Sequence, residues 1–144
     1  MRCKETATPM NDKVIFSIHP EHTKNIFDLI KQLEIRKKAP KCDFPYIGYI
    51  YETKKNGGAG AVIGFFMCKC HIKTNVFAIY SQTSDAYRKD IAKRACLSED
   101  KLYTYANGES IYGIDISTPV LFPRPRPLSD FGIKRAPQSW QYIK

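Results

Sequence analysis

Five basic residues lie close together in the first third of the chain and form a candidate anion-binding cluster. They are Lys31, Arg36, Lys37, Lys38 and Lys41, and Glu34 is the one acidic residue within that span. Such a cluster neutralises phosphate groups and releases their counterions. It is equally typical of a solvent-exposed surface after the C-terminus of a helix, where cations are favoured. Both interpretations stay open at this point.

A second basic stretch and a set of interleaved aromatic residues favour the phosphate-binding interpretation. The stretch consists of Arg124, Arg126, Lys134 and Arg135. Aromatic rings at Tyr46, Tyr49, Tyr51, Trp140 and Tyr142 are able to stack on nucleic-acid bases where they are exposed. Most of these rings are expected in the core, where aromatic residues contribute much of the buried area. Trp140, the single tryptophan, is the ring that we assign to a ligand pocket.

Three other motifs suggest chemistry that the sequence does not favour. The run Cys68-Lys69-Cys70-His71 lacks the second cluster that structural zinc sites usually have, so neither a metal nor a cofactor is expected. The run Ser17-Ile18-His19-Pro20-Glu21-His22 holds acid–base groups, but we interpret it as a strand end and a helix start. The proline-arginine run at 123–127 is either an edge segment of the fold or a ligand for a protein partner.

The elements that position these residues follow from apolar spacing and turn signals. Strands are expected at 14–18, 46–51, 61–68, 112–116 and 139–143, with a short strand after residue 34. Helices are expected from Pro20 to about Glu34, after a cap at Ser84 and after a cap at Ser98. The prolines between 119 and 127 predict extended backbone outside the sheet ladder. This order predicts an α+β fold with a mixed sheet or small barrel and flanking helices.

Composition limits the class of protein. The 144 residues favour one domain at 13–144 after a flexible tail at 1–12, and roughly 68% of the unfolded surface would be buried on folding. The 43% hydrophobic content excludes wholesale disorder. A net charge of +9 suits an anionic partner such as nucleic acid. No apolar run reaches ~18 residues and no secretory signal is present, so we expect no membrane association. Five cysteines without a disulfide pattern favour the cytoplasm.

Both ends of the chain resemble the ASCH domain of the PUA-like superfamily. The first matching segment is VIFSIHPEHTKNIFDLIKQLEIRKK, with a Ser-Ile-x-Pro turn at 17–20 and a Glu-aliphatic-Arg-Lys element at 34–37. The second is PRPLSDFGIKRAPQSWQYIK, with Arg-x-Pro-Gln-Ser-aromatic at 135–140. The resemblance implies a small β-barrel with flanking helices in which residues 34–38 lie near residues 135–140. It also implies a cleft between these two segments.

The basic clusters and the resemblance together assign the residues expected to bind nucleic acid. They are Lys31, Glu34, Arg36, Lys37, Lys38, Arg135, Gln138, Ser139 and Trp140. Arg36 is suited to a phosphate or base, and Glu34 to a base amino group. We expect a non-catalytic domain that recognises RNA or a modified base, as a regulator of transcription or translation. A small hydrolase acting on RNA or a modified nucleoside in the same cleft is the alternative.

One branch of the family hydrolyses acetylated cytidine, and its pattern is incomplete in this chain. That branch resembles Gly-x-Lys-x-x-Thr-x-Arg, and Lys31 and Arg36 occupy the lysine and arginine positions. Glu34 stands where threonine is needed, and Leu29 stands where glycine is needed. A carboxylate does not replace an activated hydroxyl nucleophile. The sequence therefore argues against this particular activity.

Overall fold

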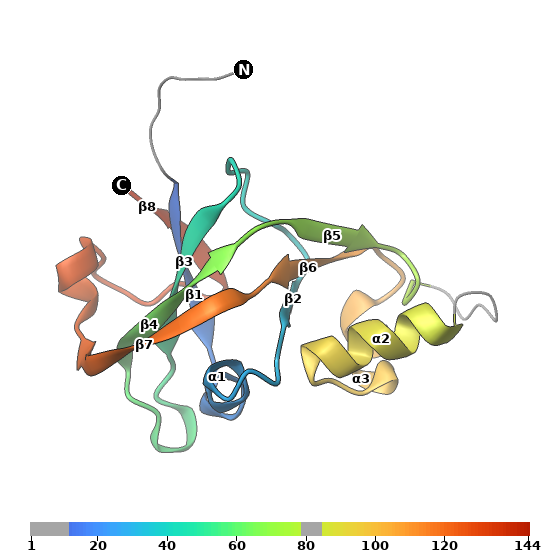
Figure 1. The fold of residues 1–144 in the computed structure, drawn as a ribbon, viewed down its shortest axis with the longest axis horizontal. Helices are drawn as coiled ribbons and strands as arrows, with labels where there is room; N and C mark the ends of the chain where they lie inside the picture. The colour runs from blue at the N-terminus through green and yellow to red at the C-terminus, as the bar shows by residue number, and fades with distance from the viewer. Residues whose placement is uncertain (1–11, 79–84) are drawn as a thin grey trace.

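The computed structural model describes residues 12–78 and 85–144, which form two β-sheets with flanking helices (Figure 1). The larger sheet has the order β7-β4-β3-β1-β8, with β1 (Lys13–Ile18), β3 (Tyr46–Glu52), β4 (Ala61–Cys68), β7 (Ser117–Arg126) and β8 (Trp140–Ile143). The smaller sheet has the order β2-β6-β5, with β2 (Leu33–Arg36), β5 (His71–Thr74) and β6 (Ile111–Asp115). The helices are α1 (Pro20–Phe27), α2 (Asp85–Ala95) and α3 (Glu99–Ala106), and two short 3₁₀ helices are η1 (Lys55–Gly57) and η2 (Leu128–Phe131). The expected tail, apart from residue 12, and the expected cap at Ser84 lie outside the described residues.

The larger sheet is mixed, as the sequence predicted. β1 runs parallel to β3, with Val14 opposite Gly48, while its other neighbour β8 is antiparallel. A parallel pair needs a long crossover, which residues 19–45 supply. Alternate residues of β1 enter two different cores: Phe16 packs in one cluster with Phe66, and Ile15 packs in another with Ile133. Both faces of β1 are therefore covered.

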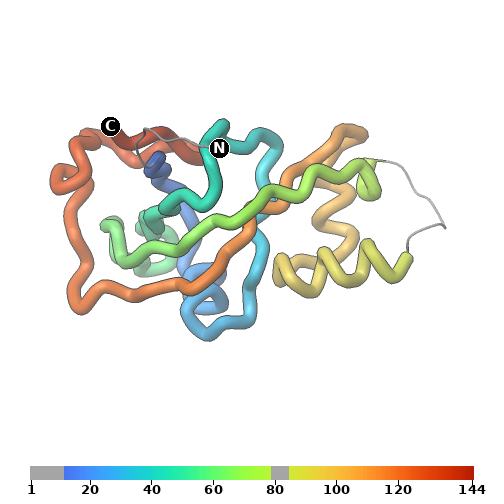
Figure 2. The backbone as a smooth tube through the Cα atoms, turned by 45° about the horizontal axis from the view of Figure 1, so that its top comes forward, coloured from blue at the N-terminus to red at the C-terminus, as the bar shows by residue number. Residues whose placement is uncertain are grey.

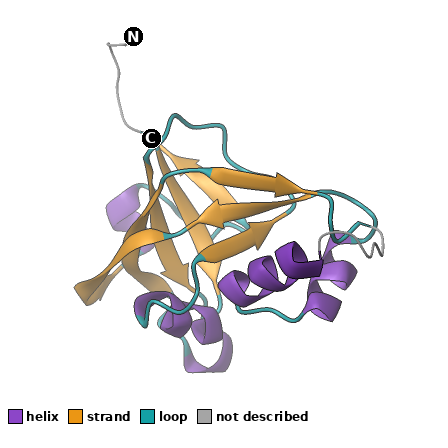
Figure 3. Ribbon diagram, turned by 45° about the vertical axis from the view of Figure 1, so that its right-hand side comes forward, coloured by secondary structure: helices purple, strands orange, loops and turns teal. Residues whose placement is uncertain are grey.

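Two helices cover the smaller sheet and make a third core with it (Figure 3). Ile91 of α2 and Leu102 of α3 pack in the same cluster as Leu33 of β2. The predicted cap of α3 is confirmed, because the Ser98 hydroxyl accepts a hydrogen bond from the Lys101 amide at 3.1 Å. This core fixes β2 and α3 relative to each other, and both elements contribute to the site described below.

The two sheets continue into each other, and the core cluster of Phe16 and Phe66 also contains Ile114 of β6. Figure 2 shows the continuous segment β4–β5 running beside the continuous segment β6–β7 along the molecule, because β4 pairs with β7 and β5 pairs with β6. The Asp115 amide donates to the Cys70 carbonyl at 3.2 Å where one sheet gives way to the other. On the opposite side, Arg36 of β2 donates to the Ser139 hydroxyl at 2.9 Å. Residues 34–38 therefore lie near residues 135–140, as predicted, and the α+β fold with a mixed sheet is confirmed.

The first helix is shorter than the sequence predicted. It ends at Phe27 with a cap at Asp28, and Leu29 takes a positive φ of 65°. The Asn25 carbonyl accepts the amides of both Ile30 and Lys31, which turns the chain sharply. Leu29 and Ile30 are therefore exposed, and Glu34 lies in β2 instead of in a helix. The pairing of β2 with β6 replaces the predicted helical continuation.

The proline-rich segment was also predicted incorrectly, because it joins the sheet as strand β7. It pairs with β4 at an edge, with interruptions in the register between Val62 and Gly64 and between Phe65 and Met67. Prolines are tolerated on an edge strand because the side without a partner needs no amide donor. This position matches the edge-segment interpretation of residues 123–127.

The two cysteines of the run at 68–71 differ in burial. β4 ends at Cys68, so Cys68 is buried while Cys70 is exposed, and the two do not share a face. The sequence also gave no signal for β5, which starts at His71. The His71 ring accepts or donates a hydrogen bond to the Tyr46 hydroxyl at 2.7 Å. Cys68 and His71 are thus part of the packing around Tyr46. Burial raises the pKa of the Cys68 thiol to about 11.

Replacing Gly48 with alanine should destabilise the larger sheet. A Cβ atom at Gly48 would lie 2.4 Å from the ring of Phe66, which is fully buried. Overpacking of this kind lowers the free energy of unfolding by about 1–3 kcal/mol. Gly113→Ala is the matched control, because its Cβ would meet Leu33 at an ordinary 3.4 Å. Chemical denaturation should show a clear loss of unfolding free energy for Gly48→Ala and a smaller loss for Gly113→Ala. Equal losses would contradict the close packing of Phe66 against Gly48.

Candidate functional site

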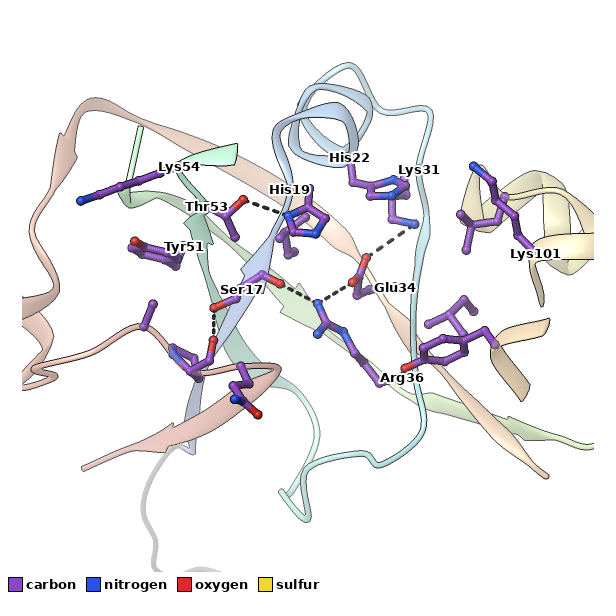
Figure 4. A pocket seen from close by; sticks show the side chains of 17 residues that line it. Ser17, His19, His22, Lys31, Glu34, Arg36, Tyr51, Thr53, Lys54 and Lys101 are labelled. Atoms are coloured by element: carbon purple, nitrogen blue, oxygen red, sulfur yellow. Dashed lines mark hydrogen bonds and ion pairs between the residues drawn. The ribbon is translucent and has the colours of Figure 1, made fainter. Parts of the chain in front are cut away.

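A cavity of about 650 Å³ opens where the end of β1, the start of α1 and strand β2 meet (Figure 4). Tyr51, Thr53, Lys54 and residues 136–138 form further parts of its wall, and α3 contributes Lys101 and Tyr105. The segments are distant in the sequence but adjacent in the fold. The volume lies within the range of 300–1,000 Å³ that is usual for small-molecule sites.

Arg36 anchors the floor of the cavity. One terminal nitrogen donates to the Ser139 hydroxyl at 2.9 Å, and the other donates to the Ser17 carbonyl at 2.8 Å and to the Glu34 carboxylate at 2.6 Å. The planar guanidinium suits this arrangement because its donors point in fixed directions. Its Nε atom is buried and has no hydrogen-bond partner among the described residues. Arg36 thus joins β2 to β1 and to the residue before β8.

Glu34 lies between two cations. Its carboxylate pairs with Arg36 and, at 3.5 Å, with the ammonium of Lys31, whose side chain is 1% exposed. The Lys31 ammonium also donates to the Ala95 carbonyl at the end of α2. Burial raises the pKa of Glu34, but the charges of Arg36 and Lys31 outweigh it and hold the pKa below its ordinary value. Glu34 is therefore ionised at neutral pH.

Two histidines form the wall at the start of α1. Extended backbone at His19 and proline at the first helical position place both imidazoles within one turn. The His19 Nδ1 atom lies 2.9 Å from the Thr53 hydroxyl. The Nδ1 atom of His22 is buried without a hydrogen-bond partner in the described structure. Burial and the nearby charge of Lys31 lower the pKa of His22, so its imidazole is neutral at pH 7.

The charges that line the cavity are mostly positive. Four cations line it, Lys31, Arg36, Lys54 and Lys101, against the single carboxylate of Glu34 among the described residues. Leaving the imidazoles aside, the lining carries a net formal charge of +3. Lys54 and Lys101 are exposed, whereas Lys31 and Arg36 are largely buried beside Glu34. The free positive charge therefore lies at the rim.

Five of the nine residues assigned from the sequence belong to this site. Lys31, Glu34, Arg36 and Gln138 line the cavity, and Ser139 bonds to Arg36 behind it. Lys37 lies outside the lining, with its ammonium 5.4 Å from the centre of the Tyr105 ring, which does line the cavity.

The structure places Lys38, Arg135 and Trp140 away from the cavity lining. The Trp140 indole donates to the Lys38 carbonyl at 3.0 Å and packs partly buried against the core. Strand β8 begins only at Trp140, so Gln138 precedes the strand and lies on the cavity wall without Trp140. Tyr105, 39% exposed, is an aromatic ring that reaches the cavity instead.

The second basic stretch does not converge on the cavity. Arg124, Arg126 and Lys134 lie outside its lining. The Arg126 guanidinium lies 4.9 Å from the Phe131 ring centre and pairs with Asp130 at 3.2 Å. Its charge is thus engaged at the far edge of the larger sheet.

Several lining residues were missed in the sequence. His19 and His22 belong to the run that predicts a strand end and a helix start, a role that they also have. Their neighbour Ser17, two positions before His19, donates its hydroxyl to the Pro137 carbonyl at 2.6 Å. Thr53, Lys54 and Lys101 carried no local signal, because only the packing of distant segments brings them to the cavity.

Within residues 12–78 and 85–144, no group of three or more histidine, cysteine or acidic side chains is arranged to hold a metal ion. Among the same residues, no helix is long and apolar enough to cross a membrane.

No protein-family model matches the chain, and no curated protein matches it in sequence. Solved structures do match. The ASCH protein of Zymomonas mobilis shares 21% identity, covering 92% of this chain and 87% of that one, with a TM-score of 0.72. A serine-to-alanine mutant of that protein covers 95% and 92% of the two chains at 20% identity and a TM-score of 0.74. A tyrosine-to-phenylalanine mutant of the same protein covers 92% of this chain and 90% of that one, at 20% identity and a TM-score of 0.72. The chain therefore has the fold of the ASCH domain, as the motifs at its two ends predicted.

Removing the guanidinium of Arg36 should destabilise the protein strongly. In Arg36→Met the buried Glu34 loses its closest cation, and the links to Ser17 and Ser139 are lost. Breaking a buried ion pair from one side costs about 3–5 kcal/mol. Lys37→Met, at the next and exposed position, should change the free energy of unfolding by no more than about 0.5 kcal/mol. Similar values for the two variants in urea denaturation would contradict the anchoring role.

Acidification should destabilise the protein through His22. Its pKa lies below the ordinary 6.5 in the folded state, so the unfolded chain binds the proton first. The stabilisation from the neutral imidazole is complete above pH 6.5 and is lost as the pH falls toward the folded pKa. Burial also lowers the pKa of His71, so protonation of this residue adds a further loss of stability on acidification. The plot of unfolding free energy against pH should be flatter for His22→Gln than for the wild type; parallel curves would contradict this.

Proposed function

We propose that this domain binds single-stranded nucleic acid, preferably RNA, by taking one nucleotide into the cavity. The observation that carries the proposal is a nucleotide-sized cavity with free cations at its rim and hydrogen-bonding groups on its floor. The resemblance to ASCH domains supports the same class of ligand. The net charge of +9 adds a general attraction for polyanions.

The lining divides into an apolar part, which suits a base, and a charged rim, which suits a phosphate. Ile18, Ile35 and Leu97 contribute apolar surface, and Tyr105 offers an exposed ring. A single-stranded base can leave its neighbours and stack on such a ring, which contributes about 1–3 kcal/mol. The phosphates on either side of that base would stay outside, within reach of exposed lysines.

Lys54 and Lys101 are the proposed phosphate contacts. Both are exposed, and no ion pair of either is found among the described residues. The sequence suits Arg36 to a phosphate or a base, but both of its terminal nitrogens are already bonded within the protein. We assign Arg36 a positioning role and leave the phosphate contacts to the two lysines.

Salt dependence should identify the two lysines as phosphate contacts. Each contact to a single strand adds about 0.7 to the steepness of log affinity against log salt, so Lys54→Ala/Lys101→Ala should flatten the slope by about 1.4. Fluorescence anisotropy with a labelled single-stranded RNA measures this slope. Lys24→Ala is the control, because Lys24 is exposed on α1 outside the cavity and should leave the slope unchanged. An unchanged slope in the double variant would contradict the proposed rim contacts.

A second candidate function is cleavage of RNA in the same cavity. The observation that favours it is the pair of imidazoles, His19 beside the Thr53 hydroxyl and His22, whose Nδ1 atom has no hydrogen-bond partner among the described residues. A neutral imidazole can accept the proton of a ribose 2′-hydroxyl, whose oxygen attacks the adjacent phosphorus; the bond from phosphorus to the 5′-oxygen breaks, and that oxygen takes up a proton from water. Such a reaction would cut RNA and spare DNA of the same sequence.

Incubation with end-labelled RNA separates the two candidates. The binding proposal expects the RNA to remain intact, with or without EDTA. Cleavage by the wild type that is lost in His19→Gln and His22→Gln, while both variants still bind RNA, would establish the hydrolase instead. Cleavage that persists in both variants would point to a contaminating nuclease.

A further inference from the structure

We propose that Glu34 makes the cavity selective for guanine, by accepting hydrogen bonds from the N1–H and N2–H groups of its Watson–Crick edge. This inference rests on the proposed function, because it names the base that enters the cavity. It is carried by three features of the floor: an acceptor with free capacity, the fixed position of that acceptor, and unpartnered nitrogens on both sides of it.

The Glu34 carboxylate has room for a ligand. An ionised carboxylate offers about four lone-pair sites. One site on Oε2 is taken by Arg36 at 2.6 Å, and Lys31 lies 3.5 Å from Oε1. One acceptor site on each oxygen therefore remains, and the residue lines the cavity. Two parallel acceptors on one carboxylate match two adjacent N–H donors.

The carboxylate is also fixed and charged before any ligand arrives. Its side chain is 10% exposed, and cations hold it from both sides. Their charges keep its pKa below the ordinary value. The acceptors therefore need no proton loss or rearrangement on binding, which lowers the free-energy cost of recognition.

Unpartnered nitrogens lie on both sides of Glu34. In Figure 4 its carboxylate lies between His22 and Lys31 on one side and the Arg36 guanidinium on the other. Nδ1 of His22 and Nε of Arg36 are buried without hydrogen-bond partners in the part of the chain described. Buried polar atoms are rarely left unpaired, so the described residues alone do not complete the hydrogen bonding of this floor. The Arg36 Nε–H can only donate, and neutral His22 can donate in one of its tautomers.

Guanine complements this order of groups. Its Watson–Crick edge presents an acceptor, O6, followed by the two donors N1–H and N2–H. Adenine has the acceptor N1 beside its amino group, and cytosine has the acceptor N3 beside its amino group. In both bases the lone pair of that nitrogen would face a carboxylate oxygen and repel it. Uracil has one donor, N3–H, between two carbonyl acceptors. Two adjacent donors for a carboxylate are thus found on guanine alone among the four bases.

The stacking surface does not add to this selectivity. Tyr105 lines the cavity and is 39% exposed, and every base has a face that can stack on it. Tyr105 should therefore contribute to the affinity of all bases alike. This difference between Tyr105 and Glu34 provides the matched pair of variants for a test.

The experiment measures the affinity of the wild-type protein for short oligouridine RNAs whose central base is varied. A central guanine should bind about tenfold or more tightly than a central uracil, in the range that a good bidentate base contact provides. Inosine, which lacks the N2 amino group, should fall between them, and N1-methylguanine should lose most of the gain. Because these comparisons use unmodified protein, they do not depend on whether a variant folds.

Two variants then assign the selectivity to the residue. Glu34→Gln should abolish the preference for guanine while retaining binding to oligouridine, and Tyr105→Ala should weaken both RNAs by the same factor. Equal affinity of the wild type for all central bases, or a preference for adenine or cytosine, would overturn the inference and leave the proposed function standing. Absence of binding to every RNA would refute the proposed function itself. A guanine preference that survives in folded Glu34→Gln would also overturn the inference.

Discussion

The guanidinium of Arg36 is the contact on which the site depends. It bonds to β1 through the Ser17 carbonyl, to the segment before β8 through Ser139, and to Glu34 in its own strand. These bonds hold the smaller sheet against the larger one on the side where no strand pairing joins β2 to β1. The same guanidinium and its partners form the floor of the cavity. The bonds of Arg36 therefore both hold the two sheets together and build the site.

Energetics make a purely structural explanation of these charges insufficient. Burying Lys31, Glu34 and Arg36 requires their removal from water, and well-packed apolar residues in such positions are often as stabilising or more so. The three groups carry a net charge of +1 and leave the Arg36 Nε atom without a partner among the described residues. A cluster that is neither neutral nor saturated is well suited to a polar ligand, such as the edge of a base, that completes its hydrogen bonds. The exposed charges at the rim, Lys54 and Lys101, add a preference for the phosphates on either side of that base.

Sequence reasoning succeeded where local patterns decide structure. β1, β3, β4 and the cap at Ser98 followed from apolar runs and turn residues. It failed at residues 28–36, where helical spacing of apolar residues competed with pairing to β6, and the tertiary pairing prevailed. It also failed for β7, because sequence alone does not show that a strand lies at an edge, where prolines are tolerated.

The site was partly predictable for the same reason. Glu34 and Arg36 could be assigned because they belong to one short motif, and Ser139 because it belongs to another. His19 and His22 were visible but had a sufficient local explanation as a helix start. Lys101 reaches the cavity only through the packing of α3 against the smaller sheet, a relation between segments more than 60 residues apart along the chain. Residues of that kind can be assigned to the site only once the fold is known.

A crystal structure of the protein with a short single-stranded RNA tests the central claim most directly. The proposed function predicts one base inside the cavity, stacked on Tyr105 and facing Glu34, with flanking phosphates near Lys54 and Lys101. RNA bound along the edge strand β7 at Arg124 and Arg126, with no nucleotide in the cavity, would contradict it.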